Sequence, residues 1–448
     1  MSGGQLADSQ LADPRTVGFA TLGCRLNQVE SQEMRALVEQ AGFRAVEEGA
    51  AARVYVVNTC TVTSRADFSD RQAIRRITRA NPDALVVVTG CLAQTDPEAL
   101  ARMPGVDLVL GNREKYLLPE LLGSIVKRDR PEVRVGLIDD AGEVPRAPIG
   151  RMGGRSRAFV KIQDGCQHRC AFCIVPAARG RSRSQEPKVL VEQIEALVEA
   201  GYGEITLTGV DIGHYGWDLL PRTSLASLVT QLTQVGGLRW LRLSSVLPAY
   251  FTPELIQAVT TLPVVVPHLH LPLQSGSDRV LRRMRRPYNT AMYRTLAERL
   301  AAAIPDLGLG TDVIVGHPGE EEADFEATMA LVGELPLSYL HVFGYSDRKG
   351  TEAAKMGNRV AASAIRERSS RLRALGVEKS LAFRRRLLGR AVEVLVLEER
   401  RADGGLTGLT SNYVEVSFAG PEGLGRRFAT VRVNEINRRG ARGVLEAA

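Results

Sequence analysis

The 448-residue sequence predicts an α/β protein of about three domains: an N-terminal open parallel sheet, a central partial (βα) barrel and a small C-terminal β-barrel. Three observations predict this organisation. Apolar, β-prone runs alternate with amphipathic helical segments over 15–130. The same alternation returns within 151–378. From 380 to 446 the pattern changes to short strands joined by Gly-rich turns, which is typical of a small closed barrel.

Composition excludes several other classes of protein. Apolar residues make up 44%, charged residues 24% and aromatic residues 5%, which argues against a disordered or fibrous chain. No stretch approaches the ~18 uninterrupted apolar residues of a membrane span. The first residues, MSGGQLADSQLADPR, lack a positive leader and an apolar stretch. We therefore expect a cytoplasmic protein that is neither exported nor bound in a membrane.

The N-terminal sheet is predicted from four apolar runs, each followed by a segment with helical spacing. The second of these helical segments is closed by Asn81-Pro82, a typical helix stop. Regular βα alternation specifies parallel strands joined by right-handed crossovers. The expected strands are 16–24, 52–60, 84–91 and 106–112, and the expected helices are 27–42, 64–82, 96–103 and 115–125.

Cys24, Cys60 and Cys91 each end one of these strands. The carboxyl ends of parallel strands share one edge, where ligands bind, and neighbouring strands lie only ~5 Å apart. The three thiols can therefore converge although they are distant in sequence. Three thiolates suit an iron–sulfur cube with one open iron, whereas structural zinc normally takes a fourth protein ligand, and no His lies near these strand ends. The simpler alternative is a set of buried, inert thiols.

A second cysteine triad is local. A strand over 158–163 leads into Asp164-Gly165, and Cys166, Cys170 and Cys173 follow with the spacing C-x-x-x-C-x-x-C. Neither a strand nor a straight helix can turn three such thiolates to one side, so we expect a loop wrapped around a cubane. One iron would again stay free to chelate a small molecule. His168 lies in this loop, and a polar loop role is a better interpretation for it than zinc ligation.

The central barrel is predicted from five further strands and the helices between them. Functional residues of such barrels lie at the carboxyl ends of the strands. There the sequence places the candidate cofactor-binding residues. These residues are Thr208, Gly209, Gln274, Ser275 and Asp312. The expected strands are 204–213, 238–246, 268–276, 309–320 and 339–346, and the expected helices are 187–201, 252–262, 290–304 and 323–335.

These softer candidates have simpler alternatives. Gln274 and Ser275 could form a plain βα turn. Asp312 lies in an apolar strand, where an unpaired carboxylate is costly to bury, which favours a functional or hydrogen-bonded role. His268 and His270 point to one face of their strand, and a hydrogen-bonded barrel interior is a better interpretation for them than metal binding.

The charge is mildly basic overall and concentrated at the end of the chain. Net charge is +7, with an isoelectric point near 9.2. From Leu381 onward there are twelve Arg, no Lys and eight acidic residues, a net charge of +4. This excess is compatible with a solvated basic surface or with a nucleic-acid-binding module.

The motifs together resemble the radical S-adenosylmethionine (SAM) methylthiotransferase family. The loop triad is the signature of the radical SAM superfamily, and the segment from about Leu381 looks like a TRAM domain, a small RNA-binding barrel. The resemblance covers nearly everything from Arg15 onward. The motifs that carry it are TLGCRLNQVESQEM, NTCTVTSRADFSDRQAIRR, VTGCLAQ, IQDGCQHRCAFCIVPAARGRSRS and LHLPLQSGSDRVLRRMRR.

The resemblance implies two [4Fe-4S] clusters, one on each cysteine triad, with SAM bound to the open iron of the second. It implies an enzyme that inserts sulfur and then methylates it, through a 5′-deoxyadenosyl radical. The branch most similar to TLGCRLNQVESQEM acts on C2 of N6-threonylcarbamoyladenosine beside the tRNA anticodon. Expected partners are the anticodon loop, a sulfur donor and an electron donor such as flavodoxin or ferredoxin, with no membrane. Two departures from the family pattern are Ala177-Ala178, where relatives commonly carry an aromatic, and His317, where an apolar aromatic is expected.

Two alternatives remain at this point. The same methylthiolation could act on isopentenyladenosine in tRNA or on a ribosomal protein. The other alternative is a non-catalytic RNA-binding protein with iron–sulfur or zinc sites, which would bind metal and RNA but would not cleave SAM. The loop triad disfavours it, because that triad has little purpose without a small-molecule ligand.

Overall fold

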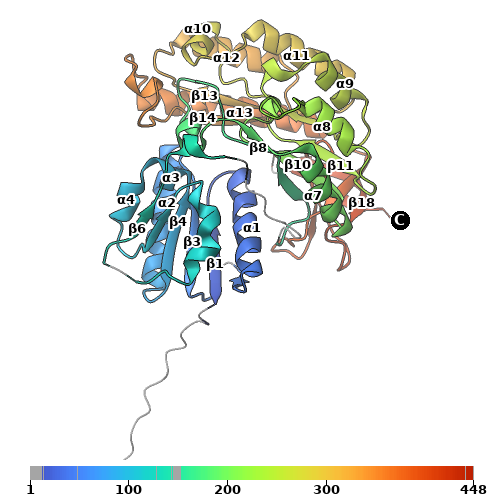
Figure 1. The fold of residues 1–448 in the computed structure, drawn as a ribbon. Coiled ribbons are helices and arrows are strands. Elements are labelled where there is room, and N and C mark those ends of the chain that lie inside the picture. The colour runs from blue at the N-terminus through green and yellow to red at the C-terminus, as the bar shows by residue number, and fades with distance from the viewer. Residues whose placement is uncertain are drawn as a thin grey trace, which may run out of the picture. The chain divides into compact units, whose positions relative to one another are not determined.

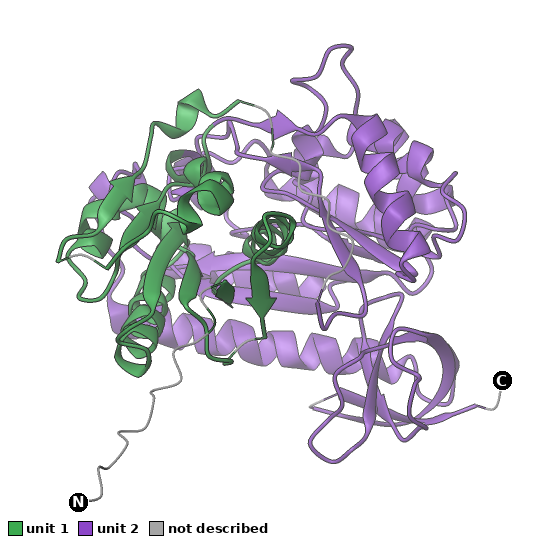
Figure 2. Ribbon diagram, turned by 60° about the horizontal axis from the view of Figure 1, so that its bottom comes forward, with its two compact units in different colours: residues 1–148, 177–180 green, residues 149–176, 181–448 purple. Residues whose placement is uncertain are grey.

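The computed structural model describes residues 13, 15–47, 49–127, 129–142, 144, 153–438 and 440–446. The chain forms two compact units, residues 1–148 with 177–180 and residues 149–176 with 181–448 (Figure 2). The predicted central and C-terminal segments thus fall in one unit. The three boundaries 15–130, 151–378 and 380–446 stay predictions. None of the described helices has the length and apolar character that crossing a membrane requires.

The first unit is built on a parallel sheet of six strands in the order β2-β1-β3-β4-β5-β6 (Figure 1). The predicted N-terminal open parallel sheet is therefore confirmed, with two short strands, β2 and β6, added at its edges. The strands are β1 (Thr16–Thr21), β2 (Arg44–Val46), β3 (Val54–Thr59), β4 (Leu85–Gly90), β5 (Leu108–Leu110) and β6 (Glu132–Arg134). β3 and β4 are buried along their whole length, as expected of strands covered on both faces.

Helices connect these strands, and two apolar cores fill the sheet's faces. The helices are α1 (Arg25–Gln40), α2 (Ser64–Ala80), α3 (Cys91–Thr95), α4 (Pro97–Ala101) and α5 (Leu118–Leu122), with 3₁₀ turns at Glu114–Leu117 and Ile138–Asp140. The single helix predicted over 115–125 is thus a 3₁₀ turn followed by α5. Pro119 explains the break, because proline cannot donate a backbone hydrogen bond to the preceding turn.

The second unit contains a partial barrel made of two three-stranded parallel sheets, β11-β10-β7 and β12-β13-β14. Bridges between Leu241 and Val265 and between Ser245 and His270 link the two sheets. The strands are β7 (Ala158–Lys161), β10 (Glu204–Thr208), β11 (Trp240–Leu243), β12 (His268–His270), β13 (Gly308–Val315) and β14 (Tyr339–Gly344). The helices are α7 (Pro187–Glu199), α8 (Leu225–Leu232), α9 (Pro253–Thr261), α10 (Asp278–Arg283), α11 (Thr290–Ala303), α12 (Glu322–Glu334) and α13 (Ala362–Arg385). The predicted (βα) alternation is confirmed.

After α13 the chain closes a five-stranded barrel in the order β15-β16-β17-β19-β18, which confirms the predicted C-terminal barrel. Its strands are β15 (Ala391–Val396), β16 (Leu406–Thr410), β17 (Glu415–Phe418), β18 (Phe428–Asn437) and β19 (Gly440–Leu445). The barrel packs on the core of the same unit, where buried Arg242 donates to the Ser411 carbonyl at 2.8 Å and pairs with buried Glu204 at 2.7 Å.

Candidate functional site

Three cysteines of the first unit meet at the carboxyl edge of three adjacent strands. Cys24 caps α1 after β1, Cys60 directly follows β3, and Cys91 opens α3 after β4. Cys24 is exposed, whereas Cys60 and Cys91 are buried. Burial, reinforced by the other two cysteines, raises the pKa of Cys60 to about 12. Burial raises the pKa of any cysteine in this way, so it is the placement of the three thiols at one sheet edge that fits a metal-cluster site.

Two glycines hold the strand ends close together at this edge. Gly23 has φ +98°, and a Cβ there would lie 2.9 Å from the Cys60 Sγ. Gly90 has φ +97°, and a Cβ there would collide with the backbone of Thr59. Only glycine combines a positive φ with so close an approach. These glycines therefore let the cysteine-bearing segments converge.

A buried polar network lies behind the triad. Lys115 and Arg179 both contact the Glu30 carboxylate at 2.7 Å, and all three side chains are buried. Arg179 also donates to the Asn27 side chain at 2.9 Å, and Cys24 approaches that same Asn27 oxygen at 3.6 Å. Two buried cations therefore lie directly behind the triad and share the Glu30 carboxylate. Their charge would stabilise an anionic cluster held by three thiolates.

The network reaches the third cysteine through Asn112. Its side-chain amide donates to the Ala178 carbonyl at 2.7 Å and lies 3.9 Å from the Cys91 Sγ, and Lys115 donates to its oxygen at 3.0 Å. The positive charge of Arg179 lowers the pKa of Cys91, although burial has the larger effect and raises it overall. Sequence reasoning missed this network because its members are scattered in the sequence.

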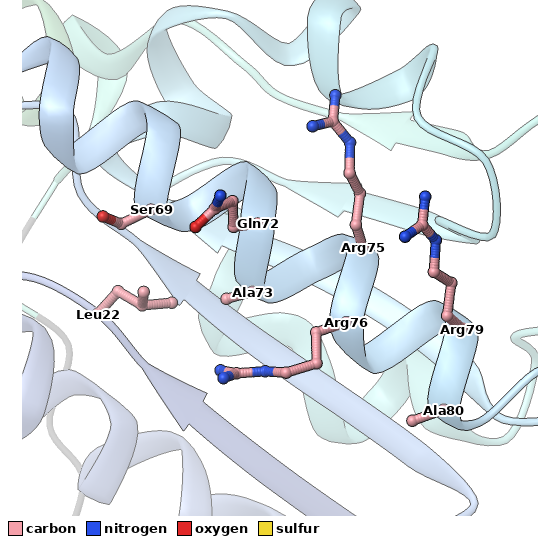
Figure 3. A pocket seen from close by; sticks show the side chains of 8 residues that line it. All are labelled: Leu22, Ser69, Gln72, Ala73, Arg75, Arg76, Arg79 and Ala80. Carbon is pink, nitrogen blue, oxygen red and sulfur yellow. The ribbon is translucent and has the colours of Figure 1, made fainter.

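Helix α2 presents a basic hollow beside the same cysteine edge (Figure 3). The hollow has a volume of about 910 Å³ and is lined by α2 residues and by Leu22. Both acidic residues of α2 are buried: Asp70 accepts from the Cys60 backbone amide at 2.8 Å, and Asp67 accepts from the Thr61 hydroxyl at 2.8 Å. The exposed charges of the helix are therefore arginines.

The second triad lies in a loop, as predicted. Cys166, Cys170 and Cys173 fall between the strand pair β8 (Gln163–Asp164) and β9 (Arg183–Ser184), ahead of α6 (Val175–Arg179). Ala171 anchors the loop: its amide donates to the Met284 carbonyl at 3.0 Å, and its carbonyl accepts from the Ala353 amide at 2.7 Å. The loop thus stands on the barrel at fixed points on both sides.

Two further groups contact this triad that sequence reasoning missed. Arg286 donates to the Cys170 Sγ at 3.1 Å, which would stabilise a thiolate. Asp211 lies 3.9 Å from the Cys166 Sγ, and Tyr250 donates to Asp211 at 3.3 Å. Burial raises the pKa of Asp211 to about 6. Tyr250 also contacts the His168 ring nitrogen at 2.7 Å, so His168 is a hydrogen-bonded loop residue here.

Four of the predicted cofactor-binding residues lie at or just after the ends of β10 and β12. Thr208 and Gly209 end β10 beside the loop triad's strand, and a Cβ on Gly209 would lie 2.7 Å from the Gln163 carbonyl. Gln274 has φ 68° and donates its backbone amide to the Asp312 carbonyl at 2.8 Å. Ser275 is buried against the Thr328 hydroxyl at 3.4 Å, which accounts for it as a turn residue. Cofactor contact by these residues stays a prediction.

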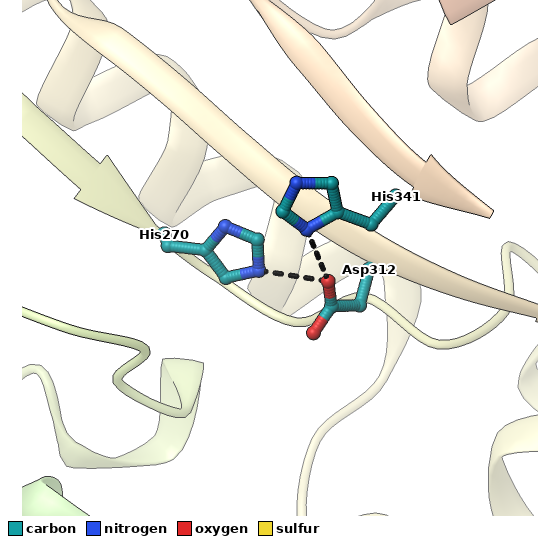
Figure 4. Close-up of side chains that lie close together, drawn as sticks. All are labelled: His270, Asp312 and His341. Atoms are coloured by element: carbon teal, nitrogen blue, oxygen red, sulfur yellow. Dashed lines mark hydrogen bonds and ion pairs between the residues drawn. The ribbon is translucent and has the colours of Figure 1, made fainter. Parts of the chain in front are cut away.

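Asp312 is held between two histidines from the neighbouring strands (Figure 4). Its Oδ1 lies 3.0 Å from the His270 Nε2 and 3.1 Å from the His341 Nδ1. Although burial acts in the opposite direction and is the largest influence, the two histidines lower the pKa of Asp312. Tyr339 extends the group by contacts to His268 at 2.8 Å and to His270 at 3.1 Å. Hydrogen bonds therefore account for both histidines of β12 and for Asp312.

The C-terminal arginines are partly neutralised. Ion pairs join Arg386 and Arg390 to Asp306, at 2.9 Å and 2.7 Å, and Arg432 to Glu446 at 2.6 Å. The net excess of positive charge in this segment nevertheless remains, since only some of its arginines are paired in this way.

Two family models match the chain. The uncharacterized protein family UPF0004 matches residues 16–111, which contain the first triad, and the radical SAM superfamily matches residues 160–332, which contain the second. The fold agrees with the second match: the structure of the radical S-adenosylmethionine methyltransferase TsrM from Kitasatospora setae superposes with a TM-score of 0.56 at 17% identity, covering 76% of this chain and 77% of TsrM. Fold and loop triad define a radical SAM protein.

Full-length relatives specify the family. The threonylcarbamoyladenosine tRNA methylthiotransferases MtaB of Bacillus subtilis and Aquifex aeolicus are each 38% identical to the chain, covering 93% and 92% of it and 93% and 98% of their own lengths. The tRNA-2-methylthio-N(6)-dimethylallyladenosine synthase of Nocardioides sp. is 37% identical and covers 96% of the chain and 88% of its own length. The chain belongs to the tRNA methylthiotransferase family, radical SAM enzymes that use SAM and [4Fe-4S] clusters.

Proposed function

We propose that this protein transfers a methylthio group to C2 of N6-threonylcarbamoyladenosine beside the anticodon of tRNA. The observation that carries the proposal is the pair of three-cysteine sites on a chain that is 38% identical, over nearly its whole length, to proteins named for that activity. The C2 hydrogen of adenine is not acidic, so acid–base groups alone cannot remove it. The activity therefore requires a radical source and a sulfur source.

The two triads would hold the two clusters. Cys166, Cys170 and Cys173 would ligate the cluster that binds SAM, and Cys24, Cys60 and Cys91 would ligate the auxiliary cluster. A [4Fe-4S] cluster with an open iron supplies a chelating site for a small ligand and the electron needed for reductive cleavage of SAM. Both triads fit the binding of a cluster, since each offers three thiols and has an arginine near one of them, Arg179 near Cys91 and Arg286 at Cys170.

The protein's own side chains would position and stabilise these sites. Arg286 donates to the Cys170 Sγ and would keep that thiolate ionised. Lys115 and Arg179 would offset the negative charge of a cluster bound to the first triad. We propose cofactor contacts for Thr208, Gly209, Gln274, Ser275 and Asp312. Thr208 ends β10 and Gly209 follows it, Gln274 and Ser275 follow β12, and Asp312 lies within β13.

The C-terminal barrel would bind the tRNA. Its excess of arginine suits the phosphate backbone, and small barrels of this kind bind oligonucleotides. An adenosine beside the anticodon lies in a single-stranded loop, where a base can be splayed out for recognition. An electron donor such as flavodoxin or ferredoxin, a sulfur donor and a cytoplasmic location complete the proposal.

Nucleoside mass spectrometry tests the substrate. tRNA from cells that lack the gene should lose 2-methylthio-N6-threonylcarbamoyladenosine and accumulate the form without the methylthio group. Wild-type gene copies should restore it, whereas copies with all of Cys24, Cys60 and Cys91 replaced by Ala should not. Loss of the methylthio form of isopentenyladenosine instead would assign the substrate named for the Nocardioides relative. Unchanged nucleosides would refute a tRNA substrate and direct the search to ribosomal proteins.

A further inference from the structure

We propose that the hollow along α2 is a second RNA-binding groove. It guides the single-stranded RNA that flanks the target nucleotide to the first cysteine triad. The inference rests on the proposed function and adds a substrate-binding surface outside the C-terminal barrel. Its basis is a set of arginines, an exposed aromatic side chain and the position of both beside the triad.

The charge of α2 is one-sided. Asp67 and Asp70 are buried against the Cys60 segment, so they do not neutralise the exposed face. Arg75, Arg76 and Arg79 are exposed, and in the described part of the chain none of them forms an ion pair with a carboxylate. Unpaired guanidiniums in a hollow provide charge complementarity to a polyanion, and their planar forks suit phosphate oxygens.

The shape of the hollow suits a chain of nucleotides. Small side chains, Ser69, Ala73 and Ala80, line it along one face of α2. Figure 3 shows Arg75 and Arg79 projecting to one side of the helix and Arg76 to the other. A phosphodiester backbone lying across the small residues would therefore lie beside the guanidinium of Arg76, and those of Arg75 and Arg79 line the hollow on the other side of the helix.

The hollow also borders the cysteine edge. Leu22, two residues before Cys24, lines it. Ser69 lines it too and directly precedes Asp70, whose carboxylate accepts from the Cys60 amide. An RNA strand bound along the hollow would thus pass next to the segments that carry Cys24 and Cys60, two of the three cysteines.

An exposed aromatic side chain stands in the same stretch of α2. Phe68 is 58% exposed and directly precedes Ser69. Val62, in the segment between Cys60 and α2, is 51% exposed. Aromatic side chains beside basic grooves are stacking platforms for unpaired bases. This combination favours single-stranded RNA over an acidic protein partner, for which arginines alone would suffice.

Salt-dependent RNA binding tests the groove. The holoprotein with both clusters is titrated, without SAM, into a fluorescein-labelled anticodon stem–loop RNA that carries N6-threonylcarbamoyladenosine, over a series of KCl concentrations. The test variant is Arg76→Gln with Arg79→Gln. The matched control is Arg299→Gln with Arg366→Gln, two exposed helical arginines of the other unit that also lack a carboxylate partner among the described residues. Equal iron content in all proteins verifies their folding.

Two lost phosphate contacts should reduce the slope of log affinity against log salt by about 1.4, at ~0.7 per phosphate of a single strand. The control should keep the wild-type slope. Phe68→Ala should weaken binding on the order of tenfold at an unchanged slope, because stacking releases no counterions. Val126→Ala, which changes a 53% exposed apolar residue of the same unit, should bind as the wild type does.

If the slope of log affinity against log salt were equal in the test and control variants, the proposed groove would be refuted. Normal RNA binding by the test variant, together with slower electron transfer from flavodoxin, would also refute the groove, because the arginines would then bind an acidic protein. Failure of the proposed function gives a different result. A wild-type protein that binds the RNA but never forms a methylthio product would refute the function and leave the slope comparison valid. A wild-type protein that does not bind the RNA would overturn both.

Discussion

Lys115 and Arg179 converge on one oxygen, the Oε1 of Glu30, at 2.7 Å each. Both cations are buried, and the carboxylate between them is fully buried. The first cysteine triad therefore stands in front of two buried cations that share this carboxylate. A cluster bound by three thiolates is anionic, so the site is arranged to favour its presence.

Removing the shared carboxylate should destabilise the protein. Glu30→Gln removes the carboxylate that two buried cations share, and breaking a buried ion pair typically costs about 3–5 kcal/mol. Urea unfolding of the reduced apoprotein measures the change in the free energy of unfolding. Glu39→Gln, at an exposed position of the same helix, should change it by less than about 0.5 kcal/mol. Equal effects of the two substitutions would show that the pairs contribute little.

The approach of Gly23 to Cys60 should be necessary for the first cluster. In Gly23→Ala the added Cβ would lie 2.9 Å from the Cys60 Sγ, so the thiol must move. Iron content after anaerobic reconstitution should fall toward half of the wild-type value, in a protein that keeps the loop triad.

Gly42→Ala separates this clash from backbone strain. Gly42 also has a positive φ, +84°, but a Cβ there meets nothing within 4 Å. Its replacement should cost about 1 kcal/mol of stability and leave iron content unchanged. A Gly42 variant that also loses iron would contradict the steric explanation.

Arg286 should tune the cluster of the loop triad. Arg286→Gln removes a cation that donates to the Cys170 Sγ at 3.1 Å. The reduced, more negative cluster loses more stabilisation than the oxidised one, so its reduction potential should fall by on the order of tens of millivolts. The measurement is an EPR-monitored redox titration in a background with Cys24, Cys60 and Cys91 replaced by Ala. Arg285→Gln, which changes an exposed neighbour, should leave the potential where it is.

His317 should make the protein sensitive to acid. It is fully buried, its Nε2 has no hydrogen-bond partner among the described residues, and burial lowers its pKa from 6.5 to about 4. The unfolded chain then binds a proton that the folded chain does not, so stability falls as the pH drops from 6.5 toward 4. Relative to His317→Phe, the wild type should lose about 2 kcal/mol between pH ~7 and ~5 in urea unfolding. Parallel pH profiles of the two proteins would refute this assignment.

The sequence was sufficient to predict those structural elements and cysteine sites whose pattern is periodic or local. Strand–helix alternation predicted the N-terminal parallel sheet and the partial barrel, and the carboxyl ends of β1, β3 and β4 were identified because each run stops at a cysteine. The loop triad could be recognised because three thiols within eight residues exclude regular structure. The prediction of a single helix over 115–125 was wrong, because periodicity follows the spacing of apolar residues and does not register that Pro119 lacks a backbone N–H.

Only the tertiary structure decided what surrounds the cysteines. Glu30, Lys115 and Arg179 are far apart in the sequence and carry no common pattern, yet they meet because helix α1, the turn after β5 and residues 177–180 pack together. Arg286 reaches Cys170 and Tyr339 joins two histidines for the same reason. The sequence alone determined the fold class and the cysteine ligands to expect, because these depend on spacing along the chain. The charges, contacts and hollows around those ligands depend on long-range packing, which spacing along the chain does not encode.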